Sequence, residues 1–281
     1  MQDLRQLRII DSHVHFWRVN APGHRWPDLS LPLLYRDFGP ADLLAATASE
    51  PLESVVLVQS QPDERDTDWL LEVAAQTPLV GAVVGWVDLA SPEAPARIAQ
   101  LAAFPKMRGL RPMLADIEDT HWLLRPEIEP ALLAMAQHGM RLEFLIQPRH
   151  LTVVAEFAQR WPRLPVVIDH GAKPHIARDE IQPWRAEIAA LRNLPNVYCK
   201  LSGLRTEQVQ GAPVGQLKPY VRHLLDTFSD RLMWGSDWPV LLHSGDRYLE
   251  WLAQTRLLTG LPEQEMETLM RAAAAQFYGL K

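Results

Sequence analysis

The stretch RIIDSHVHFW, residues 8–17, is an apolar, β-branched run that carries two histidines, His13 and His15, near its end. Such a run is typical of a buried strand, in which successive side chains point to opposite faces. This alternation predicts that Asp11, His13 and His15 share one face. An open doubly wound sheet usually has a glycine-rich phosphate loop after its first strand, and His-Val-His occupies that place here. The stretch therefore disfavours the doubly wound fold.

Seven further strand-like runs follow, and helical patterns separate them. Alternating strands and helices predict a parallel sheet. Eight such units in about 250 residues match the size of a (β/α)₈ TIM barrel, with the open doubly wound sheet as the alternative. We therefore predict one α/β domain over residues 1–281, with a barrel like that of the metal-dependent hydrolases. After 8–16, the expected strands are 54–60, 79–89, 107–113, 140–147, 165–171, 196–203 and 231–237.

The composition narrows the class of function. The chain has 281 residues, a formal net charge of −6 and 47% hydrophobic residues, so it lacks the basic surface that nucleic acids and anionic membranes attract. Cys199 is the only cysteine, which excludes an intrachain disulfide and a zinc-thiolate cluster. No apolar run is long enough for a signal peptide or a membrane span. We expect a cytoplasmic protein that acts on a small molecule; the sequence does not indicate its oligomeric state.

Polar side chains recur toward the carboxyl ends of the expected strands, where barrel enzymes place their active sites. Charged groups are costly to bury unless they are paired, so this pattern favours a functional site. We expect these side chains to meet the two histidines at the barrel mouth. They are Arg111, Glu143, His170, Lys200 and Asp237.

Each of these residues also has a structural explanation. His170 could bond a carbonyl group, and Asp237 could cap the next helical segment. Lys200 is equally well read as an ion-pair partner of Glu143 or Asp237. Trp17 follows the first strand near the mouth, where packing is the commoner role for a tryptophan. In the fifth expected strand, the alternate residues Leu142, Phe144 and Ile146 form an apolar face suited to the helix layer, and Cys199 faces that layer in the seventh.

Several motifs together resemble the amidohydrolase superfamily, and more narrowly its lactonase-like branch of sugar-lactone and 2-pyrone-4,6-dicarboxylate hydrolases. They occur in order from the first expected strand to the last, so the resemblance covers nearly the whole chain. The combination of GSDWP, DHGAKP and CKLSG is specific, whereas His-x-His alone is not. The motifs are IIDSHVHFW, MRGLRPML, LLRPEIEPALLAMAQHGMRLEFLIQPRHL, VVIDHGAKP, NVYCKLSGL and RLMWGSDWPV.

The resemblance implies a (β/α)₈ barrel that hydrolyses the ester of a lactone. It equates His13 and His15 with the histidine pair of the first strand, His170 with a later strand-end histidine, and Asp237 with the aspartate that handles the attacking water. These four residues could hold one divalent metal ion such as zinc, because imidazole and carboxylate are its usual ligands. Lys200 stands where the two-metal members have a further ligand, which disfavours a binuclear centre. The branch also contains metal-independent members.

The resulting mechanistic hypothesis assigns Asp237 as the general base and His170 and Lys200 as stabilisers of the tetrahedral oxyanion. Substrate binding is assigned to Arg111, whose guanidinium grips oxyanions bidentately, and to Glu143 and Trp17. Two alternatives remain open at this point. One is a metal-dependent non-oxidative decarboxylase of the same superfamily, and the other is a sugar-acid binding protein without catalytic activity.

Overall fold

The computed structural model describes residues 7–48, 50 and 52–281. Its eight strands form one sheet in which every neighbouring pair is parallel and the spatial order follows the chain from β1 to β8. The expected domain 1–281 also includes residues 1–6, 49 and 51, which lie outside the described residues. The strands are β1 (Ile9–Val14), β2 (Leu52–Val58), β3 (Val80–Gly85), β4 (Met107–Leu110), β5 (Arg141–Phe144), β6 (Val166–Ile168), β7 (Val197–Leu201) and β8 (Leu232–Trp234).

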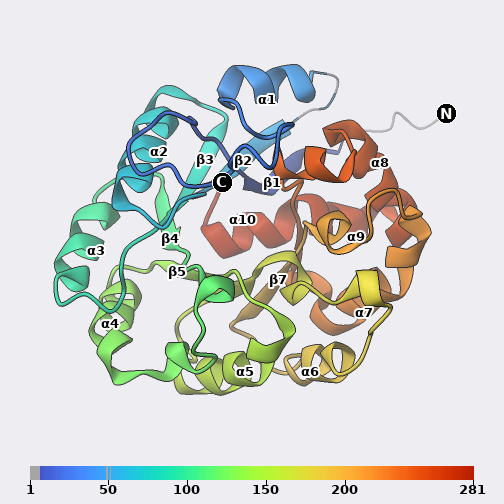
Figure 1. The fold of residues 1–281 in the computed structure, drawn as a ribbon. Coiled ribbons are helices and arrows are strands. Elements are labelled where there is room, and N and C mark those ends of the chain that lie inside the picture. Colours follow the sequence, from blue (N-terminus) through green and yellow to red (C-terminus); the bar gives the residue numbers. More distant parts are fainter. Residues whose placement is uncertain (1–6, 49, 51) are drawn as a thin grey trace.

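Hydrogen bonds between β1 and the segment after β8 bring the two edges of the sheet together. The backbone N–H of Asp237 donates to the carbonyl of His13 (2.9 Å), and that of His15 donates to the carbonyl of Trp238 (2.8 Å). The predicted (β/α)₈ barrel is confirmed, with the helices surrounding the strands in Figure 1. The helices are α1 (Pro40–Ala46), α2 (Glu64–Gln76), α3 (Ala94–Ala102), α4 (Glu129–Gln137), α5 (Leu151–Arg160), α6 (Trp184–Ala190), α7 (Lys218–Phe228), α8 (Tyr248–Thr259), α9 (Glu263–Glu267) and α10 (Ala273–Tyr278).

Local sequence explains where these elements begin and which face they bury. The side chain of Asp63 accepts a hydrogen bond from the N–H of Arg65 at the start of α2 (2.9 Å), which satisfies one of the free donors of the first turn. The buried residues of that helix, Thr67, Leu70, Leu71 and Ala74, follow helical spacing and form one stripe toward the sheet. No helix in the described part of the chain is both long and apolar enough to cross a membrane.

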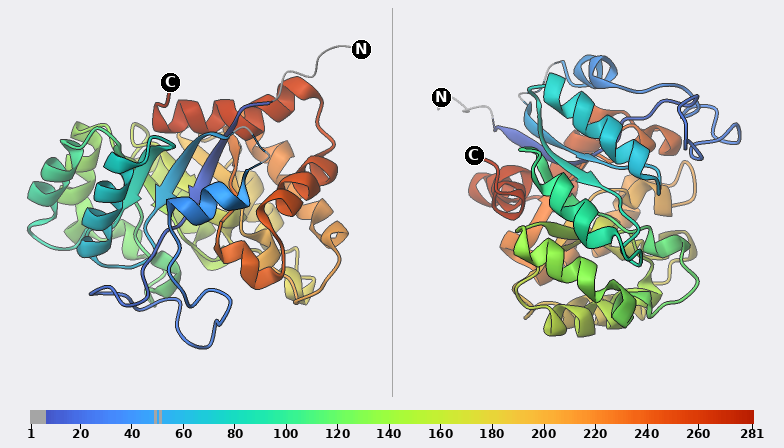
Figure 2. Two further views of the ribbon diagram at one scale, coloured as in Figure 1. Left: turned by 90° about the horizontal axis from the view of Figure 1, so that it is seen from above. Right: turned by 90° about the vertical axis from the view of Figure 1, so that its left-hand side faces the viewer.

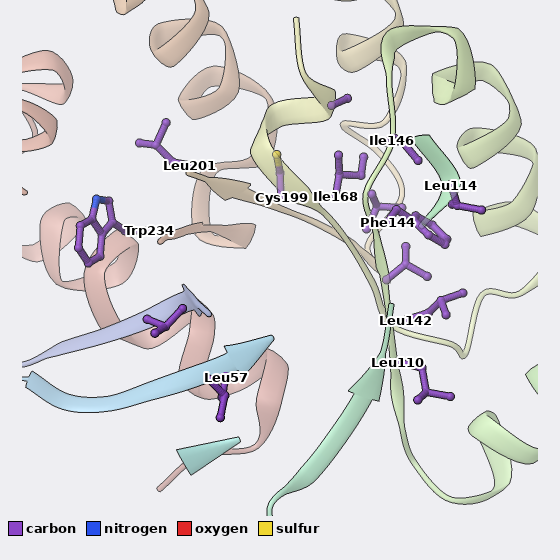
Figure 3. Close-up of a cluster of buried hydrophobic side chains, with 14 of the residues drawn as sticks. Leu57, Leu110, Leu114, Leu142, Phe144, Ile146, Ile168, Cys199, Leu201 and Trp234 are labelled. Carbon is purple, nitrogen blue, oxygen red and sulfur yellow. The ribbon is translucent and has the colours of Figure 1, made fainter. Parts of the chain in front are cut away.

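Two apolar layers hold the barrel together. The larger layer lies between the strands and the outer helices. It contains Leu142, Phe144 and Ile146 of the β5 region and Cys199 of β7, as predicted. Figure 3 shows these side chains together with others from neighbouring strands.

The smaller layer fills the barrel interior near the start of the strands, and we call it the barrel floor. Helix α10 closes this end; in the left view of Figure 2 it lies across the ends at which the β1 and β2 arrows begin. The segment after β1 extends beyond the opposite ends of the strands in the same view. The floor consists of Ile10, Val56, Val58, Ala82, Val84, Val167, Tyr198, Met233, Ala273, Ala274, Phe277 and Tyr278.

The prediction that Asp11 shares a face with His13 and His15 is wrong. Asp11 pairs with Val55 of β2 and Val14 pairs with Leu57, so three steps along β1 face two steps along β2. Such a bulge inserts one residue and reverses the alternation beyond it. The carboxylate of Asp11 therefore lies away from the barrel mouth, where it accepts the backbone N–H groups of Ser236 (2.9 Å) and His13 (3.1 Å).

Strands β6 and β8 end earlier than the expected 165–171 and 231–237. Strand β6 ends at Ile168 and β8 at Trp234, so His170 and Asp237 lie in the loops that follow. Both residues have a left-handed backbone, with φ of 53° at His170 and 58° at Asp237. An extended ladder cannot continue through such a residue, and the chain turns there toward the barrel mouth.

Candidate active site

A cavity of about 700 Å³ opens at the carboxyl ends of the strands. Four of the predicted residues line it: His15 after β1, Arg111 after β4, His170 after β6 and Asp237 after β8. A cavity of this size at this end of a barrel is typical of a small-molecule site. Its other walls are largely apolar, with Trp26, Leu31, Leu34, Met113, Leu145 and Val240 among the lining residues.

His13, His15 and Asp237 converge on one point. The two Nε2 atoms are 3.1 Å apart, and Oδ1 of Asp237 is 3.7 Å from Nε2 of His13 and 3.5 Å from Nε2 of His15. Ligands of a tetrahedral zinc ion, bound at 2.0–2.2 Å, lie about 3.3–3.5 Å from one another. The three donor atoms therefore fit a zinc ion in spacing and chemical type.

His170 does not join this set, so the expected group of four ligands is divided. It belongs instead to a second group that could hold a metal, with His13 and Asp169. Its Nδ1 lies 2.8 Å from the hydroxyl of Ser202, which orients the ring beside the cavity. Gly203 lies so close that a Cβ at that position would be 2.4 Å from Nδ1 of His170.

The ring nitrogens of His13 and His15 also have hydrogen-bond partners without an ion. The Lys200 ammonium donates to Nδ1 of His13 (3.0 Å), which leaves the ring proton on Nε2, where it faces Nε2 of His15 (3.1 Å). Nδ1 of His15 in turn donates to the carbonyl of Val58 (2.8 Å). Arg111 Nη1 lies 3.4 Å from Nε2 of His13, so positive charge stands near both nitrogens of this ring.

Four buried charges surround His13 and balance one another. Lys200 pairs with Glu143 (2.6 Å) and Asp169 (3.3 Å), and Arg111 pairs with Asp169 (3.0 Å). The side chains of Glu143, Asp169 and Lys200 are completely buried, and that of Arg111 is nearly so. Two cations and two anions in direct contact offset the cost of burying each charge.

Asp169 is a buried site residue that the sequence interpretation missed. Val167 points into the barrel floor and Ile168 into the helix layer, so strand alternation carries Asp169 inward. The turn after Asp169 then brings the side chain of His170 to the same inward side. Alternation counted from Val167 could therefore have identified Asp169, whereas assigning His170 to the strand concealed it.

Electrostatics fix the charge states at the cavity. Burial acts to raise the pKa of Asp237, but nearby His170, His15 and His13 outweigh it and lower the pKa below its ordinary value. Burial lowers the pKa of His170 to about 4, against the opposing effect of Asp237 and Asp169. At neutral pH the cavity therefore presents an ionised carboxylate beside a neutral imidazole.

Four predicted residues lie outside the cavity lining: His13, Trp17, Glu143 and Lys200. Glu143 and Lys200 are buried behind His13, so the structure does not support direct contact of Glu143 with substrate or of Lys200 with an oxyanion. Trp17 packs against Phe38 (ring centroids 5.3 Å apart), and its indole N–H donates to the carbonyl of Arg36 (2.8 Å). Its position is that of a packing residue beneath the loop that follows β1.

That loop forms part of the cavity wall and is held by Gln61. The amide oxygen of Gln61 accepts the backbone N–H groups of Arg25 (2.8 Å) and Trp26 (3.2 Å), and its amide nitrogen donates to the carbonyl of Trp26. Gln61, Arg25 and Trp26 all line the cavity. The sequence interpretation did not identify Gln61.

Comparisons with known proteins agree with this geometry. A model of the amidohydrolase family matches residues 10–280. The L-fucono-1,5-lactonase of Burkholderia ambifaria is 48% identical over 248 residues, which cover 87% of this chain and 85% of that protein. The L-fucono-1,5-lactonase of Burkholderia multivorans is 32% identical over 292 residues, 96% of each protein.

A solved structure adds the three-dimensional likeness. An amidohydrolase of Burkholderia multivorans, crystallised with bound zinc, has a TM-score of 0.90 and 31% identity to this chain, covering 97% of this chain and 99% of that one. The fold and the sequence similarity thus agree along nearly the whole length. The chain belongs to the amidohydrolase family, in the branch that contains lactonases.

Proposed function

We propose that the protein is a hydrolase that opens the ring of a lactone, most directly a sugar aldonolactone, by attack of water on the ester carbonyl. The observation that carries this proposal is the 48% identity to an L-fucono-1,5-lactonase over 87% of the chain. The cavity supports it, because an ionised carboxylate, imidazoles and a guanidinium meet there beside apolar walls.

Asp237 is the proposed general base. Its carboxylate lines the cavity and is ionised at neutral pH, so it is able to accept a proton from the attacking water. Its Oδ1 lies 3.5 Å from Nε2 of His15 and 3.7 Å from Nε2 of His13, which places the base beside the histidine pair. His170, which is neutral at the same pH, is the proposed donor to the developing oxyanion.

Arg111 is the proposed substrate-binding residue. Its Nη1 and Nη2 are engaged by Asp169 and by the carbonyl of Gln59, whereas its buried Nε has no hydrogen-bond partner among the described residues. A buried N–H without a partner is costly, and a substrate oxygen would satisfy it. Lys200 and Glu143 are assigned to the support of His13 rather than to contact with substrate.

His13, His15 and Asp237 are the residues that would hold a single divalent ion, and zinc fits their spacing. When bound, such an ion would act as a Lewis acid toward the ester carbonyl or the attacking water. Lys200 and Arg111 oppose its binding, because each places positive charge beside His13. The steps assigned to Asp237, His170 and Arg111 involve only side chains of this chain.

The test is a pH-indicator assay on a panel of aldonolactones and one pyrone dicarboxylate. Asp237→Asn should reduce turnover by about 10²-fold or more, whereas Asp116→Asn, the same change at another cavity-lining residue, should retain most of it. Retention of more than about a tenth of turnover in Asp237→Asn contradicts the assignment of the base. Release of carbon dioxide from an aromatic acid without lactone hydrolysis would favour the decarboxylase, and saturable sugar-acid binding without turnover would favour a binding protein.

A further inference from the structure

Helix α10 reaches the active site through the barrel floor. Two arginines hold its final turn: Arg108 donates to the carbonyl of Tyr278 (3.0 Å) and Arg141 donates to that of Phe277 (2.6 Å). Cationic side chains are favourable at this end of a helix because its last carbonyls lack intrahelical donors. The anchored turn places the ring of Tyr278 completely inside the protein, among the floor residues.

The hydroxyl of Tyr278 begins a chain of polar contacts that ends at His13. It donates to Oε1 of Glu143, whose Oε2 accepts from the Lys200 ammonium (2.6 Å), and Lys200 donates to Nδ1 of His13 (3.0 Å). All four side chains are fully buried. The chain of contacts connects an outer helix to the ring whose Nε2 lies 3.1 Å from the cavity-lining His15.

Glu143 depends on both contacts. Burial raises the pKa of Glu143, while Lys200 and the Tyr278 hydroxyl act in the opposite direction. With the hydroxyl present, each carboxylate oxygen has one donor, which fixes the plane of the carboxylate and the place of the Lys200 ammonium. Without it, Oε1 would be buried with no donor, and the carboxylate could rotate away from Lys200.

We propose that Tyr278 is a positioning residue of the active site, which orients Glu143 so that Lys200 stays directed at Nδ1 of His13. This inference rests on the proposed lactonase activity for its kinetic test. It assigns α10 a part in catalysis in addition to closing the barrel. The effect passes through Glu143 and Lys200, since Tyr278 itself is not a cavity-lining residue.

The matched control is Tyr198, another tyrosine of the barrel floor. It packs against Phe277 with ring centroids 4.9 Å apart, and its hydroxyl has no hydrogen bond to a described side chain or backbone group. Tyr278→Phe and Tyr198→Phe therefore remove the same atom from the same layer. Only the first change breaks the connection to Glu143.

We expect Tyr278→Phe to lower kcat about tenfold with KM changed by less than about twofold, as loss of one hydrogen bond to a charged group predicts. Tyr198→Phe should leave both constants within about twofold of wild type. In a Glu143→Gln background, Tyr278→Phe should cause no further loss of kcat, because its target is already altered. Equal kinetics for the two phenylalanine variants, or a full tenfold loss persisting in the Glu143→Gln background, would overturn the inference.

An assay that needs no substrate distinguishes failure of the proposed function from failure of this inference. If wild-type protein opens no lactone, urea unfolding of the same variants still measures the contact. The decrease in midpoint caused by Tyr278→Phe should then be at least halved in the Glu143→Gln background, whereas that of Tyr198→Phe should be unchanged. Independent, additive effects of Tyr278→Phe and Glu143→Gln would contradict the coupling on which the inference depends.

Discussion

Lys200→Met removes one charge from the buried set in which two cations and two anions balance. Glu143 loses its 2.6 Å partner, and Asp169 keeps Arg111, at 3.0 Å, and the ring of His13, at 3.5 Å. Both Lys200 and Glu143 are fully buried, so water cannot replace the lost partner. Breaking a buried pair from one side costs about 3–5 kcal/mol.

This loss can be expressed as a change in Tm. Unfolding entropy of about 2.1 cal/mol/K per residue gives roughly 0.6 kcal/mol/K for 281 residues. The expected decrease in Tm for Lys200→Met is therefore roughly 5–8 °C, measured by scanning calorimetry. Lys200→Met/Glu143→Gln should recover at least half of that decrease, because Arg111 and Asp169 still balance.

The control is an exposed pair of the same type. Arg222 lies 3.1 Å from Asp226, with 70% and 49% of the side chains exposed, so Arg222→Met should lower Tm by less than about 2 °C. The reasoning is refuted if Lys200→Met behaves like Arg222→Met. It is also refuted if the decrease in Tm of Lys200→Met/Glu143→Gln equals the sum of the decreases caused by the two single changes.

Three further predictions concern pH, backbone and metal. Burial raises the pKa of Asp66 to about 6 from 3.8, so the folded state keeps this proton to a higher pH than the unfolded state does. The free energy of unfolding should therefore fall by about 2 kcal/mol as pH rises from 4 to 6. Denaturant titrations of Asp66→Asn should show that this dependence is lost, and an unchanged slope would contradict it. Gly203→Ala should lower kcat at least about tenfold, because the added methyl group displaces the His170 ring. The left-handed backbone of residue 203, with φ of 58°, should also lower the free energy of unfolding measured in urea by about 1–2 kcal/mol. Wild-type kinetics for this variant would show that the ring tolerates the methyl group. Lys200 and Arg111 disfavour the binding of a cation beside His13. Protein treated with a chelator and verified as zinc-free by mass spectrometry should therefore keep more than about half of its lactonase activity. A tenfold loss of activity that added zinc restores would contradict this prediction.

Strand alternation predicted much of the site from sequence. It placed Leu142 and Phe144 in the helix layer and Lys200 inside the barrel, because β5 and β7 are regular over these positions. It failed for Asp11, since a bulge depends on how β1 pairs with β2 and leaves no local mark in the residues.

The rest of the site depends on contacts between distant parts of the chain. Tyr278 meets Glu143 across 135 positions, and nothing in the sequence around either residue indicates the other. The position of His170 depends on consecutive left-handed residues after β6, of which only Gly171 is a usual signal for such a backbone. Non-local pairing and unusual backbone geometry are therefore what the sequence pattern could not supply.

The floor closed by α10 also has a kinetic consequence. With that end of the barrel filled by apolar side chains, the mouth is the route by which both substrate and product exchange with solvent. Hydrolysis of a neutral lactone would leave an anionic acid in a cavity lined by three cationic side chains, Arg25, Arg111 and Lys173, and by the two carboxylates of Asp116 and Asp237. Attraction to these cations would slow departure of the product, which must leave before the next substrate enters by the same route.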